Sequence, residues 1–394
     1  MRKKIILIAL SLGVMLSIAM PSVARRMPLQ PIAVAQKQEV ACCQSEPLGL
    51  DEQIWGQNGS PSDWRAMLRS IDHSLHYLQT PAAARAYSKY PVQGITRDRI
   101  RRSLERFREL VRTSRTPAEL QAAVQREFVF YQASGQDGKG NVLFTAYYEP
   151  IHQASRVPTA EYRYPLYRLP PNFAKWGKPH PTRLQLEGKD GLLGAKSRLR
   201  GLELVWLRDR LEAFLVQVQG SARLQLTDGS MMTVGYAGKT AHPYTSIGKE
   251  LAKDGKLPLS GLTLPVMLQY FTQYPFEVNN YLPRNRGFVF FRETNGAPPT
   301  GCLGVPVTAE RSIATDKSLM PPGALALMHT QLPFANDLGE MEYRNVSRYV
   351  LDQDTGSAIK GPGRVDYFMG TGKVAGDRAG VTGSRGQLYY LVLK

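Results

Sequence analysis

The feature that most restricts the fold of this 394-residue chain is a closely spaced series of short, aromatic and β-branched segments after residue 127. Their length and composition are typical of β-strands, and Asp228-Gly229 between two of them favours a tight hairpin. Such spacing predicts a small closed β-barrel rather than a parallel sheet with regular helical crossovers. The expected strands are 128–131, 142–148, 164–168, 202–207, 214–219, 223–226, 231–236, 288–292 and later segments up to 388–393.

Helical periodicity precedes these strands. Apolar residues recur every three or four positions from Trp64 to Leu78, which predicts an amphipathic helix. Thr96 is expected to cap a second, arginine-rich helix, and the segment 116–119 has the composition of a capping box with proline in the first turn. Two helices are also expected among the strands, at 246–253 with Gly255 as a stop signal and at 265–281.

The N-terminus has the organisation of a secretory signal. Three basic residues precede an apolar run of 16 residues from Ile5 to Met20, and small residues follow as far as Ala24. The run is shorter than the roughly 20 residues that span a membrane. We therefore expect residues 1–24 to be a signal peptide and the protein to be exported to the periplasm or cell wall. An uncleaved membrane anchor is the alternative, and residues 25–59 are expected to be a flexible linker.

The charge balance indicates an anionic partner. The chain has a formal net charge of +17, and loss of residues 1–24, with their three basic side chains, would leave +14. An exported protein of this charge is expected to meet an anionic cell wall, membrane surface or polysaccharide, and export argues against nucleic acid. The alternative is a solvated surface that opposes aggregation.

Cysteine and histidine give no sign of a disulfide framework or a metal centre. Cys42 and Cys43 are adjacent in the expected linker, and no Cys/His spacing is typical of zinc. His73 and His76 are interpreted as surface residues of one helix face, and Cys302 as a small buried apolar residue. We therefore expect neither a metal nor a cofactor.

Three glycine-containing segments, 315–323, 353–361 and 364–372, each contain an aspartate that could carry chemistry. Asp354 begins Asp-Thr-Gly-Ser, a motif of pepsin-like proteases, but a single-chain aspartic protease needs two such motifs and this chain has one. Asp316 and Asp352 are interpreted as turn residues that bond their own backbone. For Asp354, a turn role and a functional role are equally open.

Asp366 differs because Val365 and Tyr367-Phe368 flank it. A carboxyl group that is partly desolvated in this apolar setting has a raised pKa and can act as a general acid near neutral pH. An ion pair with Arg364 is the alternative.

Together, these segments resemble the membrane-bound lytic murein transglycosylase A family. The aspartate segments are similar to its C-terminal three-aspartate module, and further blocks follow the family's order over roughly two-thirds of the chain. These blocks are FTAYYEP (144–150), YPLYRLPP (164–171), VQVQGSARLQLTDG (216–229), YAGKTAHPYTSIGKEL (236–251), FVFFRE (288–293) and MPPG (320–323).

The resemblance implies a mainly β fold, in which a double-psi β-barrel domain contains a second, smaller inserted β-barrel and a few N-terminal helices. The implied catalytic barrel is discontinuous, with residues 60–151 and 291–394, and the insert covers 152–290. The groove between the two would bind a peptidoglycan glycan strand, since ligands prefer domain interfaces.

The resemblance also implies cleavage between N-acetylmuramic acid and N-acetylglucosamine without water, which leaves a 1,6-anhydro end. Asp366 matches the family's catalytic aspartate, expected to act as acid and then as base, and Thr145 matches the threonine that bonds to it. Asp354 matches a further aspartate, expected to support a loop or stabilise developing charge. The residues expected to bind substrate are Gln217, Gln219, Tyr236, Lys239 and Asp316.

Two other functions stay open. Double-psi barrels also occur in non-catalytic proteins that bind or loosen the wall, and a water-using muramidase would employ Asp354 as its base. A monomer is expected, and a cell-wall synthesis or division complex is a candidate partner. One departure concerns lipid anchoring, because some family members have a cysteine directly after the apolar run of the signal and this chain does not.

Overall fold

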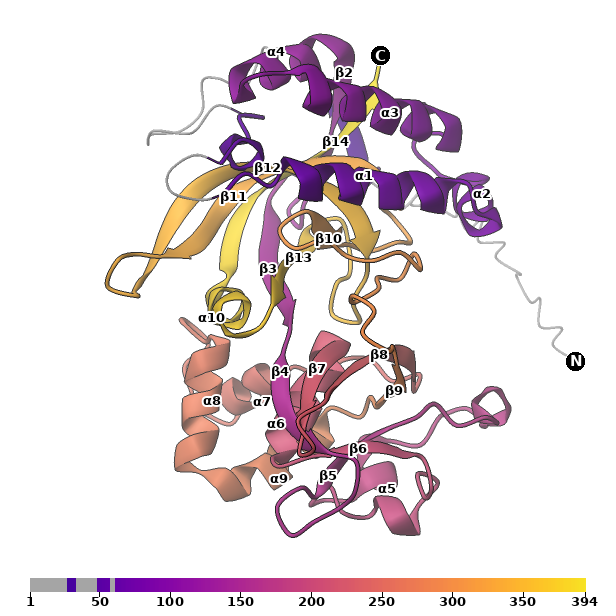
Figure 1. Ribbon diagram of the computed structural model, residues 1–394, viewed down its shortest axis with the longest axis vertical. Helices are drawn as coiled ribbons and strands as arrows, with labels where there is room; N and C mark the ends of the chain where they lie inside the picture. Colours follow the sequence, from indigo (N-terminus) through magenta and orange to yellow (C-terminus); the bar gives the residue numbers. More distant parts are fainter. Residues whose placement is uncertain (1–26, 33–47, 57–60) are drawn as a thin grey trace, which may run out of the picture.

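The computed structural model describes residues 27–32, 48–56 and 61–394. The expected signal peptide, Cys42, Cys43 and much of the expected linker lie outside these residues. The described chain forms two β-barrels arranged end to end, and helices cover the outer end of the larger one (Figure 1). Within the described ranges, no helix is both long and apolar enough to cross a membrane.

The larger barrel is built from β2 (Phe128–Ala133), β3 (Val142–Glu149), β10 (Ser312–Ala314), β11 (Leu325–Ala335), β12 (Met341–Asp354), β13 (Arg364–Thr371) and β14 (Gly383–Leu393), with β1 (Leu29–Ile32) at its edge. Its closed ring follows the order β14-β11-β12-β10-β13-β3 and returns to β14, while β2 and β1 extend the sheet outward. The pairings of β10 with β12 and of β13 with β3 are parallel. Parallel pairing across the ring brings segments together that lie far apart in sequence.

The smaller barrel lies between β3 and β10 in the chain. Its strands are β4 (Ile151–Ser155), β5 (Tyr164–Tyr167), β6 (Glu203–Leu207), β7 (Ser221–Leu226), β8 (Met231–Lys239) and β9 (Val289–Glu293). They follow the order β5-β6-β4-β7-β8-β9, and a bridge between Arg168 and Phe291 brings the two edges together. The barrel has its own apolar core. The predicted class, mainly β with a smaller barrel inserted in a larger one, is confirmed.

Four N-terminal helices cover the larger barrel: α1 (Trp64–Leu78), α2 (Pro81–Tyr87), α3 (Arg97–Thr113) and α4 (Pro117–Glu127). Thr96 caps α3 as predicted, because its hydroxyl accepts a hydrogen bond from the Arg99 amide. The Thr116 hydroxyl likewise accepts a hydrogen bond from the Glu119 amide. The Glu119 carboxylate, however, accepts its hydrogen bond from the backbone amide of Arg115. The predicted capping box is therefore only half formed.

One predicted strand is a helix. The segment 214–219 alternates like a strand, yet it belongs to α6 (Arg210–Gln219). Asp209 begins this helix by accepting hydrogen bonds from two backbone amides of the first turn. Gly220 ends it with a φ of 85°, a left-handed conformation that glycine adopts without strain. These two capping residues outweigh the alternation between them.

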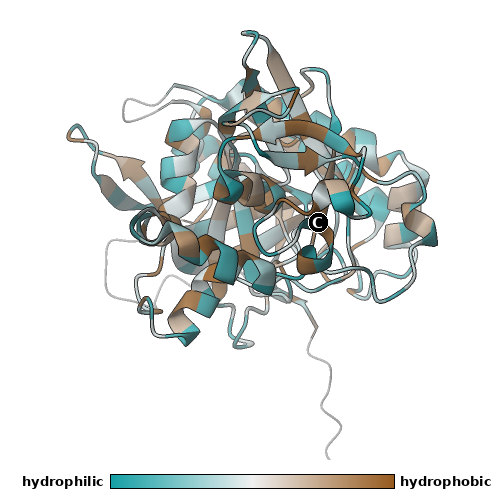
Figure 2. Ribbon diagram, turned by 90° about the horizontal axis from the view of Figure 1, so that it is seen from below, coloured by the Kyte–Doolittle hydropathy of each residue, from teal (hydrophilic) through white to brown (hydrophobic). Residues whose placement is uncertain are grey.

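The other helices lie in the insert and beside β13. The predicted helix at 246–253 is α7 (Ile247–Lys253), whereas the one predicted at 265–281 is divided into α8 (Leu264–Gln273) and α9 (Val278–Tyr281). Figure 2 shows hydrophobic and hydrophilic residues on the helices as well as on the strands. The remaining elements are α5 (Arg183–Glu187), α10 (Lys373–Val381) and 3-10 turns at Glu52–Ile54, Phe173–Lys175, Gly194–Lys196, Pro275–Glu277 and Leu282–Arg284.

Part of the predicted linker is integral to the fold. Strand β1 pairs with β2, and Asp51 is buried where it accepts hydrogen bonds from Arg311. The same guanidinium binds both carboxylate oxygens of Asp63. The prediction of a flexible linker is therefore wrong for residues 29–32, which form a paired strand, and for 48–56, where Asp51 is a partner of a buried arginine.

Candidate active site

The parallel register of β13 and β3 places Asp366 directly beside Thr145. The Thr145 hydroxyl donates a hydrogen bond of 2.6 Å to Asp366 Oδ1. On its other side, β13 pairs with β10, so Asp366 lies within the ring of strands rather than on a free loop. The barrel thus holds one carboxyl group with one of its oxygens already bound.

Asp366 is half-buried, and this burial raises the pKa of its carboxyl group. The Thr145 hydrogen bond and the Arg364 guanidinium lower that pKa, and the charge of Asp354 raises it, but burial has the largest effect. No ion pair joins Arg364 to Asp366 among the described residues. The site therefore favours a protonated carboxyl group, as expected for a general acid.

Asp354, at the end of β12, is the second carboxyl group of the site. Its Oδ2 accepts a hydrogen bond of 2.8 Å from the Tyr147 hydroxyl. Its Oδ1 accepts from the amides of Cys302, at 2.9 Å, and Thr355, at 2.8 Å. Burial nevertheless raises the pKa of Asp354.

Tyr147 was missed by sequence reasoning. It is two positions after Thr145 on β3, so both side chains lie on one face of the strand. Thr145 binds one carboxyl group and Tyr147 the other. The alternation within the 144–148 strand is the signal that could have identified it.

Asp316 binds loops on two sides. Its Oδ1 accepts from the amide and hydroxyl of Ser318, and its Oδ2 accepts from the Gly361 amide at 2.9 Å. Although burial would raise the pKa of Asp316, these hydrogen bonds hold it below its usual value. The local bond to Ser318 agrees with the predicted turn role, and the bond to Gly361 fixes the loop that precedes Asp366.

Asp352 is not a turn residue, contrary to the prediction. It lies inside β12, is fully buried, and accepts hydrogen bonds of 2.7 Å from the hydroxyls of Thr315 and Tyr390. Lys317 forms an ion pair with it. This buried network supports the barrel beneath Asp354.

The insert barrel reaches the aspartates through the end of β8 and the loop after it. Lys239 Nζ donates a hydrogen bond of 2.5 Å to the hydroxyl of Ser357, which lies in the loop after Asp354. Burial raises the pKa of Tyr244, and the charges of Asp366 and Arg364 also act on its phenol. The candidate site therefore lies between the two barrels, and Tyr244 is a further residue that sequence reasoning missed.

Three other residues were predicted to bind substrate. Tyr236 on β8 is 47% exposed and available to a ligand. Gln219 accepts a hydrogen bond of 3.0 Å from the Tyr148 amide and so joins the insert to β3. Gln217 is buried, and its Oε1 accepts from Arg183 and from the Val289 amide. Because α6 turns Gln217 inward, the structure does not bring it to the site.

Cys302 is exposed rather than buried, contrary to the prediction. The backbone amide of Cys302 donates a hydrogen bond to Asp354 Oδ1, so Cys302 lies at the edge of the site. Among the residues that the structure describes, no group of three or more His, Cys, Asp or Glu side chains is arranged to hold a metal ion.

Comparisons with known proteins agree with this architecture. Residues 143–292 match the family model described as the MltA specific insert domain, and residues 311–392 match that of the 3D domain. The membrane-bound lytic murein transglycosylase A of Escherichia coli K12 is 33% identical over 263 residues, which cover 66% of this chain and 68% of that protein. The Vibrio cholerae protein of the same name is 32% identical over 293 residues, or 74% of this chain and 75% of that protein.

Solved structures resemble nearly the whole chain. A membrane-bound lytic murein transglycosylase from Agrobacterium tumefaciens has a TM-score of 0.68 and 28% identity, over 89% of this chain and 97% of that one. E. coli MltA with bound chitohexaose has a TM-score of 0.69 and 25% identity, over 93% and 95% of the two chains. The aligned regions cover more than two-thirds of the length of both sequence relatives, and the two domain matches follow one another along the chain. This chain therefore belongs to the membrane-bound lytic murein transglycosylase A family.

Proposed function

We propose that this protein is a peptidoglycan lytic transglycosylase that cleaves the β-1,4 bond between N-acetylmuramic acid and N-acetylglucosamine, with Asp366 acting first as acid and then as base. The observation that carries the proposal is the setting of Asp366: half-buried between two barrels, with a raised pKa and with Oδ1 bound by Thr145. No described residue forms a hydrogen bond with the remaining oxygen, Oδ2, so this oxygen can exchange a proton with a ligand. Membership of the family supports the reaction class.

The reaction needs one proton donor and no water. Protonated Asp366 gives its proton to the glycosidic oxygen as the bond from that oxygen to the muramyl C1 breaks. The C6 hydroxyl of the same muramyl residue then attacks C1 and returns its proton to Asp366. Since the nucleophile is part of the substrate, positioning replaces the activation of a water molecule. The product is a 1,6-anhydro ring, and Asp366 is protonated again.

Thr145 and Asp354 assist from opposite sides of the site. Thr145 orients the carboxyl group by holding Oδ1. Asp354 is held by Tyr147 and two backbone amides, and it fixes the start of the next loop. When ionised, it stabilises the positive charge that develops on the sugar ring as the glycosidic bond breaks.

The substrate lies between the barrels. Tyr236, Tyr244 and Lys239 contact it from the insert, and the positive charge of the chain favours an anionic polymer. The similarity to a relative that binds chitohexaose supports the binding of an extended glycan. We place the protein outside the cytoplasm, in the cell envelope, because its relatives are described as membrane-bound and its N-terminus resembles a secretory signal.

Digestion of purified sacculi tests the reaction. Mass spectrometry of the released muropeptides should show anhydro ends, which are lighter by one water than hydrolysed ends. Asp366→Asn should lower the rate by about 10²–10⁴-fold, as for other general acid–base residues. Hydrolysed ends, together with equal damage from Asp354→Asn, would identify a water-using muramidase. Binding without release of fragments would identify a wall-binding protein.

A further inference from the structure

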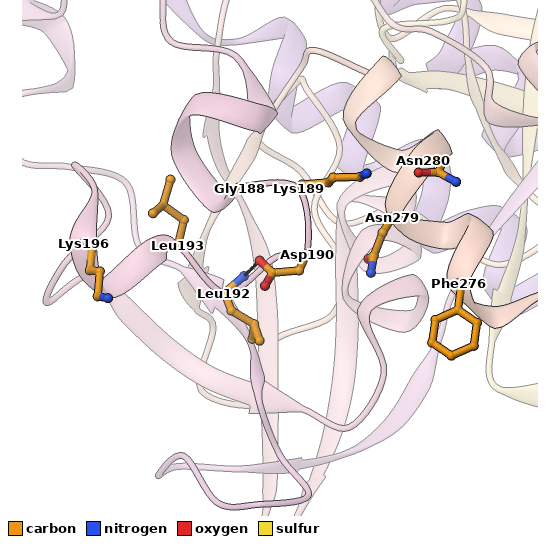
Figure 3. A pocket seen from close by; sticks show the side chains of 9 residues that line it. All are labelled: Gly188, Lys189, Asp190, Leu192, Leu193, Lys196, Phe276, Asn279 and Asn280. Carbon is orange, nitrogen blue, oxygen red and sulfur yellow. Dashed lines mark hydrogen bonds between the residues drawn. The ribbon is translucent and has the colours of Figure 1, made fainter.

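The insert barrel carries a hollow of about 780 Å³ that does not belong to the candidate active site. It lies between the segment 188–196, which follows α5, and the turns around Phe276 and α9 (Figure 3). In Figure 1, α5 and α9 are at the end of the molecule opposite the N-terminal helices. None of the residues placed in the catalytic groove lines this hollow.

The polar lining of the hollow consists of two lysines, two asparagines and Asp190, whose Oδ1 accepts a hydrogen bond of 3.0 Å from the Leu192 amide. Lys189 and Lys196 form no ion pair among the described residues, and Figure 3 shows the Lys189 side chain extending toward α9, which carries Asn279 and Asn280. Asn279 Oδ1 already accepts a hydrogen bond of 2.7 Å from Arg210, which leaves its amide NH₂ for a ligand. Two ammonium groups against one carboxylate leave the lining with a net positive charge, which together with this amide favours an acceptor with negative charge.

Beside the hollow, but outside its lining, two buried arginines share one carboxylate. Arg210 is 5% exposed and donates a hydrogen bond of 2.8 Å to Glu187 Oε1. Arg183 is 2% exposed and contacts the same carboxylate at 3.4 Å. Arg210 Nε has no hydrogen-bond partner in the described structure. Two guanidinium groups and one carboxylate leave a net positive charge beside the hollow, which adds to the attraction for an anion there.

The shape and the rim of the hollow restrict the anion further. The apolar part of the lining suits short aliphatic side chains and consists of Leu192 and Leu193 on the segment after α5 and the 86%-exposed Phe276 beside α9. A second hollow of about 540 Å³ adjoins the first, since both include Leu193 and Lys196, and it adds Lys178 to the cations. An extended ligand with a terminal anion and small apolar side chains fits both hollows.

We propose that this surface binds the terminal carboxylate of a cell-wall stem peptide and so retains the enzyme on the polymer at a point outside the catalytic groove. The proposal rests on the proposed function, because a peptidoglycan substrate presents such peptides in high local density. A peptide of a neighbouring strand occupies the hollow while Asp366 acts on a glycan between the barrels. Two binding sites on one polymer increase the time that the enzyme stays bound.

The first test needs no variant. Calorimetric titration of the protein with a synthetic alanine-terminated stem pentapeptide should show binding, and the same peptide with an amidated C-terminus should bind at least about tenfold more weakly, since it lacks the charge. Equal binding of acid and amide, or binding of neither, would overturn the proposal.

A pair of variants locates the site. The double variant Lys189→Gln with Lys196→Gln should weaken binding of the acid peptide about tenfold. The matched control, Lys253→Gln with Lys256→Gln, makes the same charge change on and after α7 of the same domain and should leave binding unchanged. Equal weakening in both variants would show a non-specific effect of charge and would contradict the site.

A last experiment distinguishes failure of the peptide-site proposal from failure of the proposed reaction. On soluble glycan chains without peptides, the Lys189/Lys196 double variant should cleave at the wild-type rate, whereas its retention on intact sacculi should fall. If the wild-type protein cleaves glycan but binds no peptide, the hollow is not a peptide site. If it binds peptide but cleaves no glycan, the proposed reaction is wrong and the peptide site stands.

Discussion

The short hydrogen bond between Thr145 and Asp366 has two opposed effects on the carboxyl group. It orients the acid, but it also stabilises the ionised form and so lowers a pKa that burial raises. The net pKa stays above the usual value because burial has the larger effect. The Thr145 hydrogen bond therefore orients the Asp366 carboxyl group, whereas burial has the largest effect on its pKa.

Replacement of this hydroxyl should separate the two effects. In Thr145→Val, we expect the rate of glycan cleavage to fall about tenfold or more, because the acid is less well oriented. The alkaline limb of the pH–rate profile should shift to higher pH, because the ionised carboxylate loses a donor. Thr145→Ser keeps the donor and should retain both the rate and the pH profile. An alkaline limb that does not move in the valine variant would contradict the assignment of Asp366 as the acid.

The raised pKa of Asp366 also predicts how stability depends on pH. The folded state holds this proton more tightly than the unfolded chain does, so the residue lowers the stability of the wild-type protein as pH rises from the ordinary value of 3.8 through the raised pKa. Asp366→Asn removes this effect. Denaturant unfolding should therefore show a gain in stability that is larger at pH 7 than at pH 3.5, and a gain that does not change with pH would argue against the raised pKa.

Among the elements, the short N-terminal segment around Asp51 contributes more than its length suggests. Arg311 is fully buried at the start of β10, and its partners are the carboxylates of Asp51 and Asp63. Asp51 also accepts a hydrogen bond of 2.9 Å from the Tyr349 amide on β12. The segment before α1 thus neutralises a cation of the barrel and joins two of its strands.

Loss of this partner should destabilise the larger barrel strongly. Asp51→Ala leaves a buried guanidinium with one carboxylate fewer, and such changes cost about 3–5 kcal/mol. Chemical denaturation monitored by circular dichroism measures the difference in unfolding free energy. Glu342→Ala, which removes an exposed ion pair with Arg344, is the matched control and should have little effect. Similar losses in both variants would contradict the proposed importance of burial.

In the molecule as a whole, the relative position of the two barrels depends on a few contacts at their junction. Glu149, at the end of β3, is 1% exposed, and its Oε2 accepts hydrogen bonds of 2.8 Å from Arg223 on β7 and from Thr371 on β13. The Lys239–Ser357 hydrogen bond adds a second connection on the side of the aspartates. We expect these contacts to set the width of the space between the barrels, where the proposed substrate would meet Asp366.

A change at this junction should affect catalysis without touching the reacting groups. Glu149→Gln removes the charge that binds Arg223, and the resulting loss of alignment should lower kcat/KM by up to about 10²-fold. Small-angle scattering should show a broader distribution of interdomain distances. Arg156→Gln removes an exposed ion pair with Glu293 in the insert and serves as the control. Unchanged kcat/KM in Glu149→Gln would mean that the junction does not align the site.

The local sequence pattern was sufficient to predict much of this architecture. Most of the strands, α1, the cap of α3 and the apolar setting of Asp366 follow from short stretches of sequence, because periodicity and capping act over a few residues. The resemblance to a family supplied Thr145 as the partner of Asp366. It also supplied the insertion of one barrel into the other.

Other features depend on contacts that no short window contains. Thr145 and Asp366 are 221 positions apart and meet only because β3 and β13 pair in one particular register. Tyr147 and Tyr244 acquire their positions in the same way. By contrast, α6 has local signals at both ends, Asp209 and Gly220, which the strand prediction for 214–219 did not take into account. Residue type sets which groups can ionise, donate or pack, whereas burial and charge at a given atom depend on distant segments, so the folded chain alone decided which carboxyl groups have a raised pKa.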